Sequence, residues 1–292
     1  MYKQLKNKVK YFVELGRYDK IYGALLLMWP CFWGSLINHE INSSLLNNLF
    51  LFFLGSFIMR GAGCTINDIV DAPIDLKVSR TKDRPIASGK IKKIEAYYFL
   101  LFQLFLGLIV VLNFDFPTIM ISIFIVPFVF LYPFVKKFSN YPQLFLGFIF
   151  NWGIIVSYFS VHKTLDFGIL YLYSAGIFFT LGYDTVYAFQ DVDDDRKLKI
   201  GSMAVKFKNY PKTVVFLSYL VSTFLFVLSF ITFNIQKDML YLMSSVISAH
   251  FLFQVIKISL HRNILMRIFV SNVYLGLIIS TGLFLNSFIF FE

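Results

Sequence analysis

A polar stretch, Asn67 to Asp75, closes a long apolar segment of the chain and reads N-D-I-V-D-A-P-I-D. Asn67, Asp71 and Asp75 are spaced i, i+4, i+8, so on a helix they would share one face, with Asp68 turned away by about 100°. Carboxylate and amide oxygens gathered in this way suit a hard divalent cation. The spacing therefore predicts a metal site on one helix face.

A cluster of basic residues follows this stretch at once, at Lys77, Arg80, Lys82 and Arg84. In proteins Mg²⁺ usually binds through one or two carboxylates together with the phosphate oxygens of a substrate. Arginine and lysine side chains bind the remaining phosphate oxygens. Acids beside bases therefore favour a site for Mg²⁺ and a phosphate over a site for metal alone.

A second stretch has the same organisation. Residues 184–199 read D-T-V-Y-A-F-Q-D-V-D-D-D-R-K-L-K. Tyr187, Asp191 and Asp195 repeat the i, i+4, i+8 spacing, and Asp184 lies seven residues before Asp191, so the four share one helical face. Acids at a membrane boundary are costly unless they are paired or coordinated, which favours a functional role for both stretches.

The composition is that of an integral membrane protein. Of 292 residues, 58% are hydrophobic and 15% are charged, against about 25% charged in soluble domains. The net charge of +10 would suggest nucleic acid for a soluble protein, but here the excess of positive charge in cytoplasmic loops explains it, and no nucleic-acid partner is expected. Cys31 and Cys64 offer neither a disulfide framework nor metal-ligand spacing.

Apolar segments of roughly the ~20 residues that span a bilayer define the fold class. Residues 1–20 are Lys-rich and predict an interfacial segment; no small-residue cleavage site follows, so no cleaved signal peptide is expected. We predict an all-α, polytopic membrane protein, a single domain over 1–292, with about nine transmembrane helices in one bundle enclosing a central cavity. The expected spans are 22–38, 46–63, 96–113, 118–135, 142–160, 168–190, 213–233, 239–260 and 267–290.

The basic residues predict the orientation. All of the 27 Lys and Arg residues except Arg60, Lys163 and Lys237 fall on one side of these spans, and Arg60 lies inside the second span. This asymmetry predicts a cytoplasmic N-terminus, with both acidic stretches at the cytoplasmic face and the C-terminus outside.

With these residues assembled, the chain resembles the UbiA-type intramembrane prenyltransferases, and within them the 4-hydroxybenzoate branch. Three motifs carry the resemblance over nearly the whole chain: N-D-x-x-D-x-x-x-D at 67–75 with R-T-K-D-R-P at 80–85, Y-D-T-x-Y-A-x-x-D-x-D-D-D at 183–195, and R-x-D-K-x-x-G-x-L-L-L-x-W-P at 17–30. The acidic pair is typical of the family, and the N-terminal motif of the branch.

The resemblance implies a Mg²⁺-dependent enzyme of the bacterial inner membrane. It would transfer a polyprenyl group from polyprenyl diphosphate to the ring carbon ortho to the hydroxyl of 4-hydroxybenzoate, in ubiquinone biosynthesis. Positive charge gathered on the leaving diphosphate favours cleavage of the allylic C–O bond. The prenyl tail would lie in membrane lipid, and no protein partner is expected. Asp71, Asp75, Asp191 and Asp195 would be catalytic and, with Asn67 and Asp68, would bind the metal.

The resemblance also assigns the substrate contacts. Tyr132 and Lys136 form a Y-x-x-x-K pair, although on their own they equally suit an interfacial Tyr and a snorkelling Lys. Arg17 is the candidate partner for the acceptor carboxylate, with Asp184 and Tyr187 beside the acceptor. The residues expected to bind diphosphate are Arg80, Lys82, Arg84, Tyr132, Lys136, Lys197 and Lys199.

The chain departs from the family pattern at three places. Ile21 stands where the family has Pro, and Pro73 removes a backbone donor, which predicts a kink or a helix end near Asp75. After the second motif the family shows Gly-x-Lys-Ser-Thr, whereas this chain reads K-I-G-S-M at 199–203. The phosphate-binding Lys is therefore displaced, or Lys199 supplies it.

Other functions stay open at this point. The same chemistry could act on another acceptor, a naphthoate or haem. Paired intramembrane acids also mark ion pathways, so a cation transporter is a second class. A transporter places such acids near the bilayer midplane, whereas here they gather at one face beside basic residues, which favours the enzyme.

Overall fold

A computed structural model describes residues 2–291 of the chain, and within them every regular element is a helix. The helices are α1 (Tyr2–Leu15), α2 (Tyr22–Leu36), α3 (Ser43–Asp75), α4 (Lys93–Val111), α5 (Phe116–Phe124), α6 (Val126–Val135), α7 (Pro142–Phe150), α8 (Trp152–His162), α9 (Phe167–Ala188), the 3₁₀ turn η1 (Phe189–Asp191), α10 (Val192–Lys197), α11 (Met203–Lys206), α12 (Pro211–Thr232), α13 (Lys237–Lys257) and α14 (Arg262–Phe291). The predicted all-α class is confirmed.

The predicted spans correspond to helices of the structure. Among the described residues, eight helical segments are long and apolar enough to cross a membrane, counting α5 with α6 and α7 with α8 as one segment each. The first predicted span is α2, which has 15 residues and is shorter than the ~20 that span a bilayer unaided. Its packing against α3, α8 and α14 makes it part of the same bundle.

Small residues let α2 and α8 approach closely. A methyl group on Gly34 would overlap the carbonyl oxygen of Ile154, and one on Gly153 would overlap the sulfur of Cys31. Close backbone approach of this kind drives helix association in lipid, where burial of apolar surface gives little gain.

Two of the spans are interrupted near their middle. The fourth breaks at Ile125, just before Pro127, and the fifth breaks at Asn151. Proline cannot donate the helical hydrogen bond, which accounts for the first break. At the second, Nδ2 of the buried Asn151 donates to the carbonyl of Gly147 at 2.9 Å and to Oγ1 of Thr180 at 2.8 Å, so the polar group is satisfied inside the bundle.

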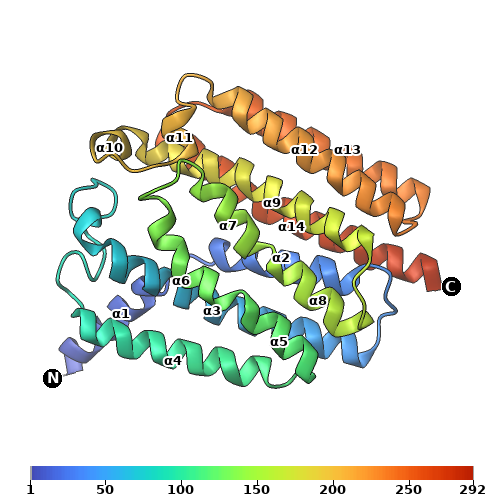
Figure 1. The fold of residues 1–292 in the computed structure, drawn as a ribbon, viewed down its shortest axis with the longest axis horizontal. Coiled ribbons are helices and arrows are strands. Elements are labelled where there is room, and N and C mark those ends of the chain that lie inside the picture. Colours follow the sequence, from blue (N-terminus) through green and yellow to red (C-terminus); the bar gives the residue numbers. More distant parts are fainter. Residues whose placement is uncertain (1, 292) are drawn as a thin grey trace.

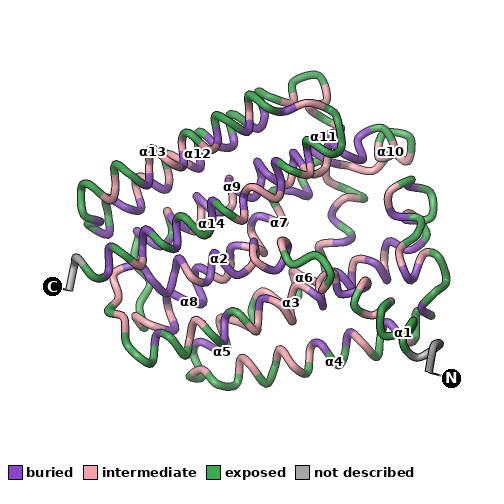
Figure 2. Tube along the Cα trace, turned by 180° about the vertical axis from the view of Figure 1, so that it is seen from behind, coloured by how far each residue is buried: buried purple, intermediate pink, exposed green. Residues whose placement is uncertain are grey.

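The helices lie side by side in one bundle (Figure 1). Residues of α2, α3, α6, α7, α9 and α14 line much of the central cavity, and α1, η1, α10 and the connecting loops add further lining residues. The outer faces of α4, α12 and α13 are largely exposed, whereas buried residues follow the inner helices (Figure 2). Helix α1 and the end of α14 lie at opposite ends of the bundle (Figure 1).

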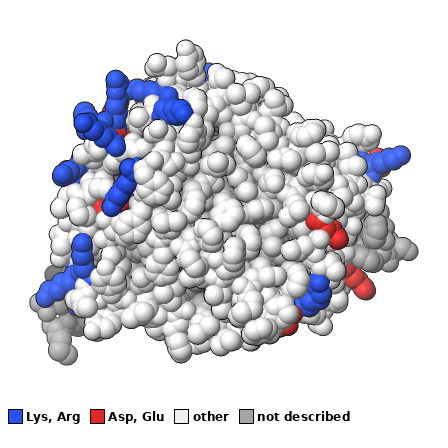
Figure 3. Space-filling view, in the orientation of Figure 1, with Lys and Arg blue, Asp and Glu red and all other residues white. Residues whose placement is uncertain are grey.

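Charge divides between the two ends of the bundle. On the face shown in Figure 3, basic side chains gather at the end where α1, α10 and α11 lie, and few are found along the apolar body. The interfacial segment predicted for residues 1–20 contains α1, which packs against α3 and, through Phe12, against Phe99 of α4. The basic end of the bundle is where the helical segments that carry the two acidic stretches meet.

Candidate active site

A cavity of about 790 Å³ opens at the basic end of the bundle. Its walls combine polar side chains from helices and loops with apolar and aromatic side chains from the helices. The predicted site residues on the wall are Arg17, Asn67, Asp68, Asp71, Asp75, Arg80, Arg84, Tyr132, Lys136, Asp184, Tyr187, Asp191 and Asp195. Segments from opposite halves of the sequence therefore build one site.

The last two turns of α3 carry the first acidic stretch. The helix continues through Pro73 and includes Asp75 as its last residue, so Asp75 does not lie past the helix end. Asp68, Asp71 and Asp75 are all buried, at 2%, 7% and 5% exposure. Asp68 also reaches the wall, so the roughly 100° between it and the Asn67 face does not remove it from the site.

The second acidic stretch is helical but not one regular helix. After α9 ends at Ala188 the chain tightens into η1 and then resumes as α10. Asp184, Tyr187, Asp191 and Asp195 nonetheless all face the cavity, as their shared face predicted. A 3₁₀ turn advances the chain faster than an α turn, which moves Asp191 and Asp195 toward the mouth of the cavity.

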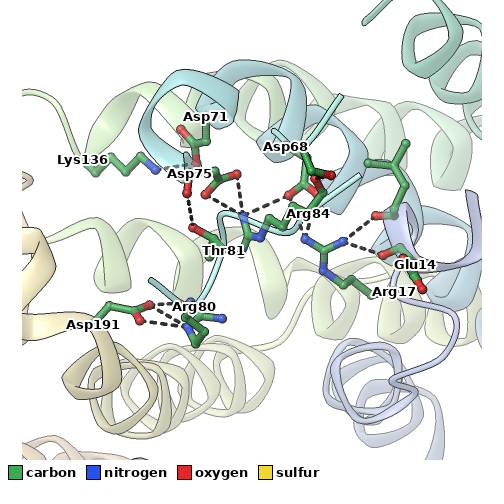
Figure 4. Close-up of polar contacts among 12 residues, drawn as sticks. Glu14, Arg17, Asp68, Asp71, Asp75, Arg80, Thr81, Arg84, Lys136 and Asp191 are labelled. Atoms are coloured by element: carbon green, nitrogen blue, oxygen red, sulfur yellow. Dashed lines mark hydrogen bonds and ion pairs between the residues drawn. The ribbon is translucent and has the colours of Figure 1, made fainter. Parts of the chain in front are cut away.

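Basic side chains lie between and beside the carboxylates of the first acidic stretch and pair with them (Figure 4). Arg84 lies between two carboxylates, and its Nη1 donates to Asp75 at 3.0 Å and to Asp68 at 3.1 Å. Nη2 of Arg17 donates to both oxygens of Asp68, at 2.9 and 2.8 Å. Lys136, at the end of α6, pairs with Asp71. Buried acids are thus neutralised by bases from three separate segments.

Arg80 joins the two halves of the site. Its Nε donates to both carboxylate oxygens of Asp191, at 2.9 and 3.0 Å, and its Nη1 donates to the hydroxyl of Tyr187 at 2.9 Å. The guanidinium also lies over the Tyr187 ring, 5.2 Å from its centre. Burial lowers the pKa of Arg80, but the hydrogen bonds that it donates to Asp191 and the nearby charges of Asp191 and Asp75 together outweigh this effect, so the pKa is raised and the side chain stays charged.

The donor set fits a divalent cation that shares its ligands with a phosphate. Oδ1 of Asp71 is buried with no hydrogen-bond partner among the described residues, and an unsatisfied buried carboxylate oxygen needs a ligand. Within residues 2–291 no three acidic, His or Cys side chains already form a metal-binding group. A cation held by one or two of these carboxylates would therefore complete its coordination with phosphate oxygens or water, as Mg²⁺ commonly does.

Arg60 is a site residue that the sequence analysis did not select. It lies on α3 seven residues before Asn67, hence on the same face and about 10 Å farther into the bundle. Its side chain lines the cavity, stacks over Phe150 at 5.5 Å, and leaves Nε buried without a partner among the described residues. A charged residue inside an apolar span is itself a signal of function, and that signal could have identified it.

Three predicted diphosphate-binding residues do not reach the wall. Lys82, Lys197 and Lys199 are exposed and absent from the cavity lining. The altered motif at 199–203 has two particular backbone features. Lys199 has a left-handed backbone, with φ of 54°, a conformation that favours glycine. A side chain at position 201 would overlap the carbonyl of Ser139. The backbone near Ser139 therefore occupies the space that a side chain at this position would need.

The chain is a polytopic bundle whose cavity gathers two acidic stretches and their bases at one end. Comparison with known proteins gives its family. Residues 27–285 match the UbiA prenyltransferase family, so the chain belongs to that family and is a prenyltransferase.

Relatives match over most of the chain. It is 36% identical to 4-hydroxybenzoate geranyltransferase 1 of Lithospermum erythrorhizon, over 97% of this chain and 92% of that protein. It is 34% identical to 4-hydroxybenzoate octaprenyltransferase of Vibrio campbellii, over 95% and 97% respectively. The names of these two relatives specify different prenyl groups, geranyl and octaprenyl, although their identities to this chain are similar. Overall sequence identity therefore does not give the length of the prenyl group.

Solved structures share the fold. A UbiA homolog from Aeropyrum pernix K1 superposes with a TM-score of 0.79 at 19% identity, covering 91% of this chain and 98% of that one. A UbiA homolog from Archaeoglobus fulgidus, bound to GPP and Mg²⁺, superposes with a TM-score of 0.70 at 16% identity, covering 94% and 99%.

Proposed function

We propose that this protein is a Mg²⁺-dependent 4-hydroxybenzoate polyprenyltransferase of ubiquinone biosynthesis, which attaches the prenyl group to the ring carbon ortho to the hydroxyl. One observation carries the proposal: a single cavity holds carboxylates and their bases at its mouth and, farther in, Arg60, whose Nε is buried without a partner among the described residues. The mouth suits a metal-bound diphosphate, and the interior suits an acceptor with its own negative charge. The names of the relatives support the same pair of substrates.

At the mouth, the bases have two alternative partners. Arg80, Arg84 and Lys136 now neutralise Asp191, Asp75 and Asp71. When a diphosphate enters with Mg²⁺, the carboxylates and Asn67 would turn to the metal, and the same bases would bind phosphate oxygens. Mg²⁺, when bound, stabilises the charge that builds on the departing diphosphate. The bases add to this stabilisation because they are already held in place around the leaving group.

Deeper in the cavity, Arg60 would bind the acceptor carboxylate. Arg17, the residue expected for this task, is engaged with Asp68, whereas Arg60 has no carboxylate partner among the described residues. Ring stacking on Phe150 leaves the edge of the guanidinium free to form paired hydrogen bonds. Asp184 and Tyr187 reach the cavity from α9 and would lie beside the acceptor.

The reaction breaks the allylic C–O bond, with its electron pair leaving on the diphosphate, and forms a C–C bond to the acceptor ring, which then loses a proton. The allylic cation must be kept from water until the ring attacks. Aromatic side chains on the wall, among them Phe150, Tyr183 and Phe269, would stabilise it through cation–π contact. The prenyl tail would extend between helices into lipid.

The protein spans a membrane several times, and we propose the bacterial inner membrane with the basic end in the cytoplasm. The gathering of Lys and Arg at the cavity end supports this orientation. It gives the site access to a water-soluble acceptor and to Mg²⁺ from the cytoplasm.

The test is prenyl transfer in isolated membranes supplied with labelled 4-hydroxybenzoate, a polyprenyl diphosphate and Mg²⁺. Lipid-soluble product should disappear with EDTA and in Asp71→Asn and Asp191→Asn. Asp193→Asn is the matched control, because Asp193 is exposed, lies outside the cavity lining and pairs with Lys208. Product formed only with a naphthoate would overturn the acceptor, and no product with any aromatic acceptor would overturn the enzyme assignment.

A further inference from the structure

The phenol of Tyr18 has no part in the mechanism above, yet it is held by an extensive buried network. Tyr18 lies between α1 and α2, directly after Arg17. Its hydroxyl accepts from Nε2 of Gln103 on α4 at 2.9 Å. Oε1 of Gln103 in turn lies 3.0 Å from the hydroxyl of Thr65 on α3. Gln103 and Thr65 are 1% and 0% exposed.

Helix α3 has a gap that matches this phenol. A side-chain carbon on Gly61 would overlap the hydroxyl of Tyr18 and would lie 2.7 Å from Nε2 of Gln103. Gly61, Thr65 and Asp68 are spaced i, i+4, i+7 and therefore lie along one face of α3. The face that receives Tyr18 is the face that, two turns later, presents Asp68 to Arg17.

Arg17 is held in an unfavourable backbone conformation. Its φ is 58°, and this left-handed region costs a non-glycine residue roughly 1–2 kcal/mol. Nη1 of the same side chain donates to the carbonyls of Glu14 at 2.6 Å and Leu15 at 3.2 Å, at the end of α1. A conformation of this cost persists only when its surroundings fix it.

We propose that Tyr18 is a positioning residue for Arg17. Anchored by Gly61 and the Gln103–Thr65 pair, it fixes the turn between α1 and α2 so that the Arg17 guanidinium holds Asp68. Among the residues that the structure describes, Asp68 otherwise accepts only from Arg84. Loss of Arg17 from Asp68 therefore commits Arg84 more fully to that carboxylate and leaves it less available for the diphosphate. This role rests on the proposed function of the site.

The test is a double-mutant cycle on prenyl transfer, with Tyr18→Phe, Arg17→Gln and the pair. Tyr18→Phe should raise the KM for the diphosphate roughly three- to tenfold, the worth of one buried hydrogen bond, and leave the acceptor KM unchanged. In the Arg17→Gln background it should add almost nothing. A Tyr18→Phe effect of the same size with and without Arg17, or an equal rise in the KM of both substrates, would overturn the proposal.

A second measurement needs no substrate. Trypsin cleavage after Arg17 in the detergent-solubilised full chain should be several-fold faster in Tyr18→Phe and Gly61→Ala than in the parent. Gly55→Ala is the control, because its added carbon would meet only Val110 at an ordinary 3.5 Å. Unchanged cleavage in Tyr18→Phe would overturn the anchoring whatever the parent catalyses, whereas faster cleavage in a parent that transfers no prenyl group would overturn the proposed function alone.

Discussion

Arg80 holds Asp191 with both carboxylate oxygens within 3.0 Å of its Nε, although 111 residues separate them in the chain. Arg80 follows the first acidic stretch and Asp191 belongs to the second, so this pair ties the two halves of the site together. The pair also keeps the Arg80 guanidinium in a fixed orientation at the mouth of the cavity. In our proposal this guanidinium exchanges the Asp191 carboxylate for a phosphate of the substrate.

The geometry of Arg80 predicts that lysine cannot replace it. A lysine would keep the charge but lose the fork that contacts Asp191 and Tyr187 together. Because a preorganised donor at a developing charge contributes about 10²-fold or more to kcat, Arg80→Lys should lower kcat by that order. Arg196→Lys, outside the cavity lining, should change kcat less than about twofold. Equal kcat in parent and Arg80→Lys would show that only charge matters there.

The position of Arg60 predicts that the enzyme prefers an acceptor with a carboxylate. Charge-assisted hydrogen bonds are worth about 1.5–3 kcal/mol, so the parent should prefer 4-hydroxybenzoate over 4-hydroxybenzamide by roughly 10- to 150-fold in kcat/KM. Arg60→Gln should reduce this preference to a few-fold while leaving the KM for the diphosphate near the parent value. Because the readout is a ratio between two acceptors in one variant, partial misfolding does not alter it. A preserved ratio would place the acceptor carboxylate elsewhere.

The position of Lys82 and Lys197 predicts a small role in binding diphosphate. Both side chains are exposed and outside the cavity lining, where a single charge is screened by water and salt. Alanine at either position should raise the KM for the diphosphate less than about threefold at physiological ionic strength. Lys136→Ala, which removes a base from the wall, should raise it far more. If Lys82→Ala or Lys197→Ala raised the KM for the diphosphate as much as Lys136→Ala, the sequence-based prediction that these lysines bind the diphosphate would stand.

The acidic residues were predictable from sequence because their pattern is local. Spacing along one helix decides which side chains share a face, and this brought Asn67, Asp71 and Asp75 to the wall together. The composition and the apolar segments likewise sufficed for an all-α membrane bundle.

What the sequence could not show depends on how separate segments fold together. The pairing of Arg84 with Asp68 and Asp75 requires the loop after α3 to turn back on its own helix. The place of Arg60 inside an apolar span was a signal in the sequence, but its contact with the cavity and its buried Nε without a partner among the described residues are visible only in the folded chain. The gap at Gly61 for Tyr18 is visible only when α1, α3 and α4 are packed.

The backbone conformation of Lys199 predicts that Lys199→Gly stabilises the protein, although this change removes a positive charge. Its φ of 54° favours glycine, which avoids the left-handed cost of roughly 1–2 kcal/mol but loses part of that gain to a more flexible unfolded chain. Lys199→Gly should therefore stabilise the protein by about 0.5–1 kcal/mol, measured as a higher Tm in detergent. Lys197→Gly removes the same charge from α10 and should lower stability by about 1 kcal/mol. Lys199 is exposed and outside the cavity lining, so Lys199→Gly should keep the parent KM for the diphosphate. A severalfold rise in this KM would show that Lys199 contacts the phosphates.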